Sequence, residues 1–346
     1  MASAGIIAQA EVTAYAPGVT SEGVTYFLPK TMLRVSVTTE ETKYIPGEFC
    51  RYAERYLKMT GLSAQEETRW SITGIEVTPV GVPDAANAYS IRLNDKSVAY
   101  NVRLTSEGIL ASVNAQTLLS QELPVSADAA ASFIVNPRDY LTEEILMAGS
   151  TAKMAELTAR EIFDIRESRN AITRGQADYV PSDGESFRYI LESLDKQEKA
   201  MLLLFTGTTT TTVHTESFDF MPDGSVKDTI LFRMSSKLGP VSADNLAGEP
   251  VFVTVRDMNL LSSSAVTSNG KSTRKEVDGI RYRVPGRASV KVATNRQTYF
   301  DEEMAIAQFG SIETLSSKLL VRKPAAETII FNTTTGNIES ISSPAF

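Results

Sequence analysis

The chain contains one histidine, His214, and one cysteine, Cys50, and these two residues limit the chemistry that it can perform. A zinc cage of His and Cys ligands, an HExxH helix, a disulfide framework and a CxxC redox pair each need a second His or Cys. A Ser-His-Asp or Cys-His site would have to use His214. The alternating run around His214 is typical of an ordinary strand histidine, although Glu216 and Asp219 are close enough in sequence to support a base. Cys50 stands beside Phe49 on the apolar stripe of an expected helix, which favours a packing role.

Two short patterns match known motifs, but their contexts argue against both. The S-x-x-K spacing, which lets a lysine deprotonate a serine one helical turn away, occurs at Ser150–Lys153, Ser193–Lys196 and Ser272–Lys275. The companion S-D-N and K-T-G motifs are absent from the sequence. Residues 265–272, AVTSNGKS, fit a relaxed phosphate-loop pattern, but a strand-like run follows them where a phosphate loop needs a helix. We interpret both matches as coincidences.

Catalysis by carboxylates alone is compatible with this composition, because a glycosidase-type site needs two acids about 5 to 9 Å apart. Asp301, Glu302 and Glu303 are adjacent, and Asp219 is close to Asp223. With 42 acidic residues in the chain, such proximity carries little information. Asp223 has the chemistry of a calcium ligand, but no DxDxDG loop surrounds it. From the sequence we therefore name no catalytic, cofactor-binding or metal-binding residue, and we expect no cofactor.

Composition and charge exclude several classes of partner. The residues are 42% hydrophobic and 22% charged, as in ordinary folded proteins. The net charge is -8 and no dense block of Lys and Arg is present, which disfavours nucleic acid or an anionic membrane as the partner. The longest apolar runs, such as residues 200–205, are far shorter than the roughly 20 residues that cross a bilayer. We therefore predict no transmembrane segment.

The pattern of elements divides the chain into three folded parts. Residues 11–140 predict an N-terminal α+β lobe, with strands over 24–39 and 69–116 and one helix behind Pro46. Residues 141–207 predict a helical hairpin, because two long runs of helix formers are joined by a short loop. Residues 208–346 begin with five threonines and predict a C-terminal β-rich lobe. The expected fold class is α+β: two antiparallel β-rich lobes, the first with one packed helix, separated by a long antiparallel helical hairpin.

The first ten residues resemble the end of an export signal. They read MASAGIIAQA and finish in the A-x-A pattern that precedes signal-peptidase cleavage. The only cysteine is at position 50, so a lipid anchor at the cleavage point is not expected. We therefore interpret residues 1–10 as a signal-peptide remnant, with an ordinary mobile N-terminus as the alternative.

Three long stretches of the chain carry a family resemblance. They are TYFLPKTMLRVSVTTEETKYIPGEFCRYAERYL, then AREIFDIRESRNAITRG with LDKQEKAMLLLFTG, and then FRMSSKLGPVSADNLAGEPVFV. Together they resemble a family of exported Bacteroidetes proteins that is known only as a domain of unknown function. The resemblance covers nearly the whole mature chain. It implies a periplasmic, secreted or cell-envelope location, and it supplies no activity, ligand or catalytic residue.

Two functional hypotheses remain after these exclusions. The first is a non-enzymatic binding or structural protein of the bacterial cell envelope, in which the charged helical hairpin docks a partner protein. The alternative is a carbohydrate-active hydrolase or glycan-binding module that uses carboxylates. Aromatic side chains gathered in one cleft, for example Trp70, Tyr89 and Tyr100, would favour sugar stacking and hence the alternative. The sequence does not predict the oligomeric state.

Overall fold

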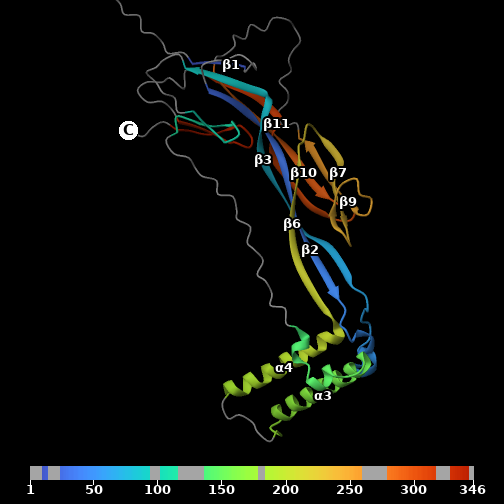
Figure 1. Ribbon diagram of the computed structural model, residues 1–346. Coiled ribbons are helices and arrows are strands. Elements are labelled where there is room, and N and C mark those ends of the chain that lie inside the picture. Colours follow the sequence, from blue (N-terminus) through green and yellow to red (C-terminus); the bar gives the residue numbers. More distant parts are fainter. Residues whose placement is uncertain are drawn as a thin grey trace, which may run out of the picture.

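The protein is an elongated β-rich molecule with a group of helices at one end (Figure 1). A computed structural model describes residues 10–14, 24–93, 102–115, 136–177, 184–258, 279–316 and 328–342. Within these residues the strands form three antiparallel sheets. The prediction of an antiparallel β-rich fold with few helices is therefore confirmed.

The first two sheets contain the long strands. The order of the first sheet is β1 (Ala10–Ala14), β3 (Glu67–Leu93), β2 (Val24–Ile45), β6 (Thr208–Phe220). The order of the second sheet is β11 (Thr298–Ser316), β10 (Gly279–Ala293), β9 (Glu249–Asp257), β7 (Val226–Ser235), β8 (Gly239–Val241). The order of the third, smaller sheet is β13 (Ile338–Ser342), β12 (Thr328–Phe331), β5 (Leu110–Val113), β4 (Val102–Leu104).

Two strand pairings cross the boundary that we expected between the N-terminal and C-terminal lobes. β6 lies beyond the expected lobe boundary, yet it pairs with β2 along its whole length, from Leu33 opposite Phe220 to Ile45 opposite Thr208. β12, near the C-terminus, pairs antiparallel with β5, which belongs to the expected N-terminal lobe. Strands from both sides of the helical region therefore share sheets, because each needs a partner that the local sequence does not supply.

Alternation along the strands decides which side chains form the core. In β2, Leu33, Val35 and Val37 are fully buried, whereas the residues between them point away from the core. They pack against alternating residues of β9 and β10 in one cluster of buried apolar side chains. A second cluster joins all three sheets around Tyr26 and Ile280. The first two sheets therefore pack face to face, and we call this two-layered part of the molecule the body.

Two long hairpins, β2–β3 and β10–β11, carry the same interruption. Phe27 pairs with Ala88 and Pro29 with Pro83, so that one residue of β2 stands opposite residues 84–87 of β3. In the second hairpin Val284 pairs with Ser311 and Gly286 with Ile306, so that one residue of β10 stands opposite residues 307–310 of β11. Such a bulge bends the strand that carries it and re-aims its side chains. We call the region where the two bulges meet the waist.

Beyond the body the first sheet continues as a single layer, which we call the arm. It consists of residues 40–45 of β2, 67–71 of β3 and 208–213 of β6, held in antiparallel register. None of these residues is buried. The arm leads from the body to the helices (Figure 1).

Helices and short helical turns form the far end of the arm, and we call them the helical tip. They are η1 (Cys50–Tyr52), α1 (Ala53–Leu57), η2 (Pro137–Tyr140), α2 (Glu143–Leu146), α3 (Thr151–Thr173) and α4 (Gly184–Thr206). The helices lie at one end of the molecule and not between two lobes, which corrects that part of the expected fold (Figure 1). The connection between α3 and α4, residues 178–183, lies outside the described residues, so the helical hairpin stays a prediction.

Candidate functional site

The lone histidine lies on the first sheet, where the arm leaves the body. The Nε2 atom of His214 is 3.1 Å from Oε2 of Glu41, and the centroids of the His214 and Trp70 rings are 4.9 Å apart. Register brings these residues together from three strands, because Glu41 pairs with Trp70 and its neighbour Thr39 pairs with His214. The only histidine and the only tryptophan of the chain are therefore in contact. Sequence reasoning missed this because the partners come from separate strands.

This cluster lacks the parts of a catalytic site. Trp70 is covered by the turn between β7 and β8, where a Cβ on Gly239 would lie 2.9 Å from the ring. The hydroxyl of Thr39 is buried without a hydrogen-bond partner among the described residues, and Thr39 itself is 0% exposed. No substrate can therefore reach that hydroxyl. The Glu41 carboxylate, and neither Glu216 nor Asp219, is the acid that contacts His214, and the cluster fastens the body to the arm.

The other residues with catalytic or ligand chemistry are dispersed. The Ser150 hydroxyl accepts a hydrogen bond from the Lys153 backbone N–H and caps α3, while the Lys153 ammonium pairs with Glu156. Ser193 and Lys196 lie on α4, with no hydrogen bond or ion pair between them. Residues 265–272 and Ser272–Lys275 lie outside the described residues. Cys50 is a free thiol in η1.

The carboxylate pairs of the sequence also separate. Asp219 accepts two hydrogen bonds from the guanidinium of Arg34, and this hydrogen-bonded cation lowers the pKa of Asp219. Glu303 pairs with Arg287 on the surface of the second sheet. Asp223 lies in the turn that follows β6. Among the described residues, no group of three or more His, Cys, Asp or Glu side chains could hold a metal ion.

The aromatic side chains that would favour sugar stacking do not gather. Trp70 contacts His214, and Tyr89 packs against Tyr26 with ring centroids 5.9 Å apart. Burial of Tyr26 raises the pKa of its hydroxyl, which bonds to the backbone of β10. Tyr100 lies outside the described residues.

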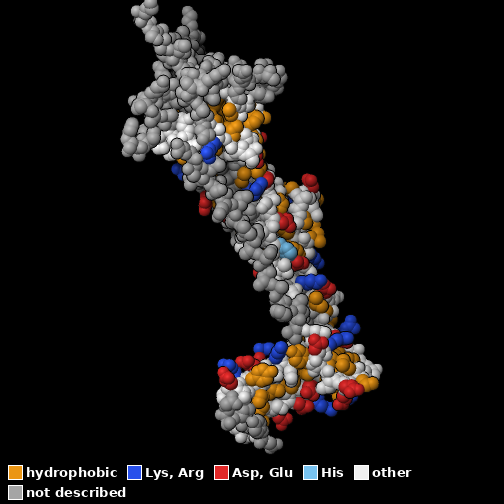
Figure 2. All heavy atoms as spheres, turned by 60° about the vertical axis from the view of Figure 1, so that its left-hand side comes forward, with side chains coloured by type: hydrophobic (Ala, Val, Ile, Leu, Met, Phe, Trp, Pro, Cys, Tyr) orange, Lys and Arg blue, Asp and Glu red, His pale blue; other side chains and the backbone are white. Residues whose placement is uncertain are grey.

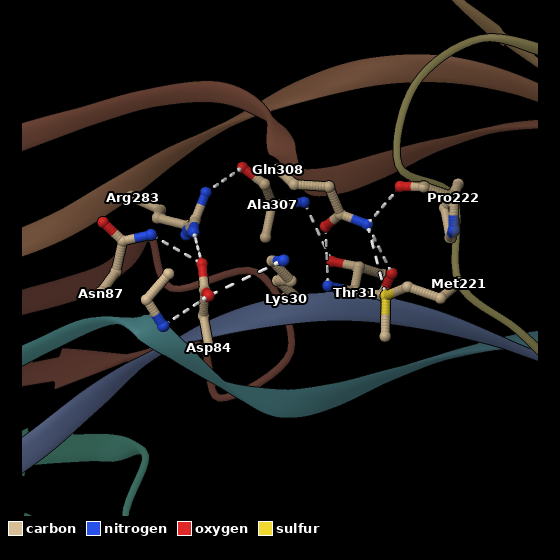
Figure 3. A network of polar contacts seen from close by, with 10 residues as sticks. Lys30, Thr31, Asp84, Asn87, Met221, Pro222, Arg283, Ala307 and Gln308 are labelled. Atoms are coloured by element: carbon tan, nitrogen blue, oxygen red, sulfur yellow. Dashed lines mark hydrogen bonds and ion pairs between the residues drawn. The ribbon is translucent and has the colours of Figure 1, made fainter.

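A buried polar network lies at the waist (Figure 3). Asp84 from the first bulge accepts hydrogen bonds from Arg283 at 2.5 Å and from Asn87 at 2.7 Å. Both members of the Asp84–Arg283 pair are nearly inaccessible, with side chains 3% and 6% exposed. Burial lowers the pKa of Arg283, and the nearby Asp84 carboxylate opposes that effect.

The second bulge also contacts the first hairpin. Gln308 accepts a hydrogen bond from the backbone N–H of Thr31 and donates to its carbonyl, both at 2.9 Å. The backbone N–H of Ala307 donates to the Thr31 hydroxyl. Each bulge therefore holds a strand of the other hairpin, while Lys30, whose side chain is 33% exposed, lies 3.7 Å from Asp84 at the edge of the network. We assign the waist to assembly of the fold, since Asp84 and Arg283 are buried against each other.

The helical tip is joined tightly to the arm. The backbone N–H of Phe49 donates to the carbonyl of Leu204 at 2.7 Å. A Cβ on Gly47 would lie 2.3 Å from that same carbonyl oxygen, and one on Gly207 would lie 2.3 Å from the carbonyl oxygen of Ile45. Only glycine permits these approaches, so the tip has a fixed position on the arm.

Inside the tip, apolar packing and one ionic network hold α3 to α4. Ala155, Ala159 and Ile162 of α3 pack with residues of α1, α2 and α4 in one buried cluster. Glu198 of α4, whose side chain is 8% exposed, accepts hydrogen bonds from Arg166 at 2.6 Å and from Arg169 at 2.7 Å. A nearly buried carboxylate that is held by two guanidinium groups fixes the register of the two helices.

The outside of the tip exposes large apolar side chains (Figure 2). Met147 is 77% exposed, Tyr189 74%, Leu146 51% and Phe163 49%. On α3, Glu161, Asp164 and Glu167 follow one another at helical spacing and make no ion pair with any described residue. The tip therefore combines apolar and acidic groups on its surface, which is suited to binding.

Comparison with known proteins identifies a family but no activity. No curated protein and no solved structure matches the chain. None of the described helices has both the length and the apolar character needed to cross a membrane. A family described as a domain of unknown function matches residues 22–339, which confirms the resemblance at that level. The match spans the body, the arm and the helical tip together, and the chain therefore belongs to the family described as a domain of unknown function (DUF4831).

Proposed function

We propose that this protein is a non-enzymatic binding component of the bacterial cell envelope and that its helical tip docks a partner protein. The observation that carries the proposal is the exposure of large apolar side chains at the end of a single-layered arm. Exposed apolar groups of this size, when they are gathered, mark interaction surfaces. The arm supports the same conclusion, because its strands enclose no core and serve to hold the tip away from the body.

The charges of the tip indicate the chemistry of the partner. Glu161, Asp164 and Glu167 of α3 lack ionic partners among the described residues. The guanidinium of Arg166 lies over the Phe163 ring, 5.7 Å from its centroid. A complementary surface would offer Lys or Arg side chains around an apolar pocket that receives Phe163. We therefore propose a basic protein surface as the partner.

Envelope location is a separate part of the proposal. It rests on the export-like pattern of residues 1–10 and on the sequence resemblance, and residues 1–9 lie outside the described residues. Fractionation of cells that express the full-length protein tests it. Recovery in the envelope or periplasmic fraction is expected, and recovery with cytoplasmic markers would contradict it.

A hydrolase that uses carboxylates receives no support from the described residues. Asp219 is held by Arg34, and Glu303 by Arg287. The binding of a glycan does not need two acids, and a separate observation favours it below.

Site-specific photo-crosslinking tests docking at the tip. A photoreactive amino acid in place of Phe163 or Tyr189 is expected to give one crosslinked product with the same partner in intact cells. The same substitution of Leu246, which is 82% exposed on the body, is the matched control and should give none. Purified partner should bind the Phe163→Asp variant at least tenfold more weakly.

The docking proposal is wrong if positions 163 and 189 give no product, or if the control gives the same product. It is also wrong if Phe163→Asp leaves affinity unchanged while its folded state, followed by circular dichroism, is intact.

A further inference from the structure

The outer face of the second sheet is hollowed by a cavity of about 340 Å³. Its lining comes from β7, from β9, and from β10 with the turn that follows it. The alternation of β9 points Val251, Val253 and Val255 into the core and Phe252 and Thr254 outward. The cavity is therefore separate from the core, from the waist and from the helical tip.

A bulge in β7 places a carboxylate at one side of this cavity. Val226 pairs with Val255 and Thr229 with Val253, so β7 carries extra length between them. Within it Asp228 adopts a left-handed backbone with φ of 50°. Its backbone N–H donates to the Thr254 hydroxyl at 3.2 Å, and that hydroxyl donates to Oδ1 of Asp228 at 3.1 Å. Aspartate is one of the non-glycine residues that adopt this conformation most readily, and left-handed non-glycine residues are enriched at functional sites.

An aromatic ring lies in the cavity beside a small neighbour. Phe252 is half-buried and pairs across the ladder with Ala293. Because the alanine side chain is a single methyl group, it leaves open space beside the Phe252 ring. Aromatic surface of this kind is what the apolar face of a sugar ring stacks against.

Donors lie opposite the carboxylate. Lys291 is directly across the ladder from Thr254. Asn295 is exposed in the turn after β10, which the Thr294 hydroxyl closes by accepting from the backbone N–H of Gln297. The side chains of Lys291 and Asn295 make no hydrogen bond or ion pair with a described residue, and Lys291 does not reach Asp228 although both line the cavity. The cavity therefore contains two unpaired donors, Lys291 and Asn295, and a carboxylate acceptor, Asp228, that they do not contact.

We propose that this cavity binds a hexose unit of a glycan. Sugar hydroxyl groups both donate and accept, so adjacent hydroxyls can donate to the free oxygen of Asp228 and accept from Lys291 and Asn295. The ring face stacks on Phe252. A cavity of about 340 Å³ is at the small end of ligand sites and matches one sugar unit better than a long chain. This inference does not depend on docking at the helical tip.

Binding of defined sugars to the full-length protein tests the inference. Saturation-transfer NMR with D-glucose, D-galactose, D-mannose and N-acetylglucosamine, together with a glycan array, is expected to identify at least one ligand. The Phe252→Ala and Asp228→Asn variants should each weaken its binding about tenfold. Asparagine tolerates the left-handed backbone, so Asp228→Asn removes the charge and keeps the bulge.

Arg256→Gln is the matched control, because Arg256 lies on the same outward face of β9 but outside the cavity. Its affinity should equal that of the unaltered protein. The inference is wrong if no sugar binds, or if Arg256→Gln weakens binding as much as Phe252→Ala and Asp228→Asn do. Detection of free amino acids or peptides as the only ligands that depend on Phe252 also overturns it.

Discussion

The two long hairpins begin alike and end differently. Each has a tyrosine three residues before a proline at its bulge, Tyr26 before Pro29 and Tyr282 before Pro285, and each continues in alternating buried residues. β10–β11 turns back at residues 294–297, within the body. β2–β3 instead runs on to Ile45 with no second layer and carries the helical tip. The two hairpins therefore share the same pattern near their bulges. They differ because β2–β3 extends past the end of the second sheet and forms the arm.

The largest expected effect tests the waist that joins the hairpins. Asp84→Ala leaves the Arg283 guanidinium buried without its counter-charge, so we expect a loss of about 3 to 5 kcal/mol in the free energy of unfolding. Urea denaturation followed by circular dichroism measures this loss. The double variant Asp84→Leu with Arg283→Met should recover most of it, since no buried charge remains. A cost below about 1 kcal/mol for Asp84→Ala would show that the bulges do not interlock the hairpins.

The next effect tests whether the hairpins are equivalent in the core. Val35 of β2 and Val290 of β10 are both 0% exposed and belong to the same buried cluster. Either Val→Ala substitution removes two methyl groups and should cost about 2 kcal/mol. If both variants lose the same free energy of unfolding in the same denaturation experiment, the two hairpins contribute equally to the core. A difference of more than about 1 kcal/mol would break the comparison.

A smaller effect distinguishes the arm from the body. Amide hydrogens of residues 40–45 in β2 are expected to exchange at least tenfold faster than those of residues 33–37, because the arm has no buried apolar contacts. Hydrogen exchange followed by mass spectrometry measures both segments in one peptide map. In β10, where the hairpin ends with its core, residues 288–292 should exchange as slowly as residues 33–37. Uniform protection along β2 is the result that would refute a separate arm.

The smallest effect concerns Arg34 and Asp219, which link β2 to β6 on the exposed face. Both side chains are 45% exposed, so solvent screens the pair and Asp219→Asn should cost less than about 1 kcal/mol. The pKa of Asp219 is lowered, so this contribution is complete above the ordinary carboxyl pKa of about 3.9 and disappears as pH falls through the lowered value. Stability of Asp219→Asn and of the unaltered protein should therefore converge once the pH has fallen through the lowered pKa of Asp219. Equal stability of the two proteins at neutral pH would show that the Arg34–Asp219 pair does not stabilise the contact between β2 and β6.

The sequence predicted local features well and long-range pairing poorly. The strand predicted within residues 24–39 is observed as part of β2. The same local signal cannot tell which strand will pair with β2, and so β6 was placed in a separate lobe. The waist was equally invisible, because Asp84 and Arg283 are ordinary charged residues until two bulges, remote in sequence, bring them together.

The candidate sites show the same limit. The sequence indicated that His214 lies on a strand, and the structure agrees. Its contact with Glu41 and Trp70 depends on a register across three strands, which no spacing in the sequence encodes. The cavity on the second sheet depends on the left-handed conformation of Asp228, which a Lys-Asp-Thr run does not signal.

The glycine-tight junction between arm and tip has a mechanical consequence. The tip meets the arm through direct backbone contacts at Gly47 and Gly207, so it cannot swivel freely. The three strands of the arm all run lengthwise from the tip to the body. A pull on the tip would therefore be carried by the covalent backbones of all three strands together, and extended strands of this kind can lengthen very little. Under tension the arm should behave as a stiff tether that transmits force to the body.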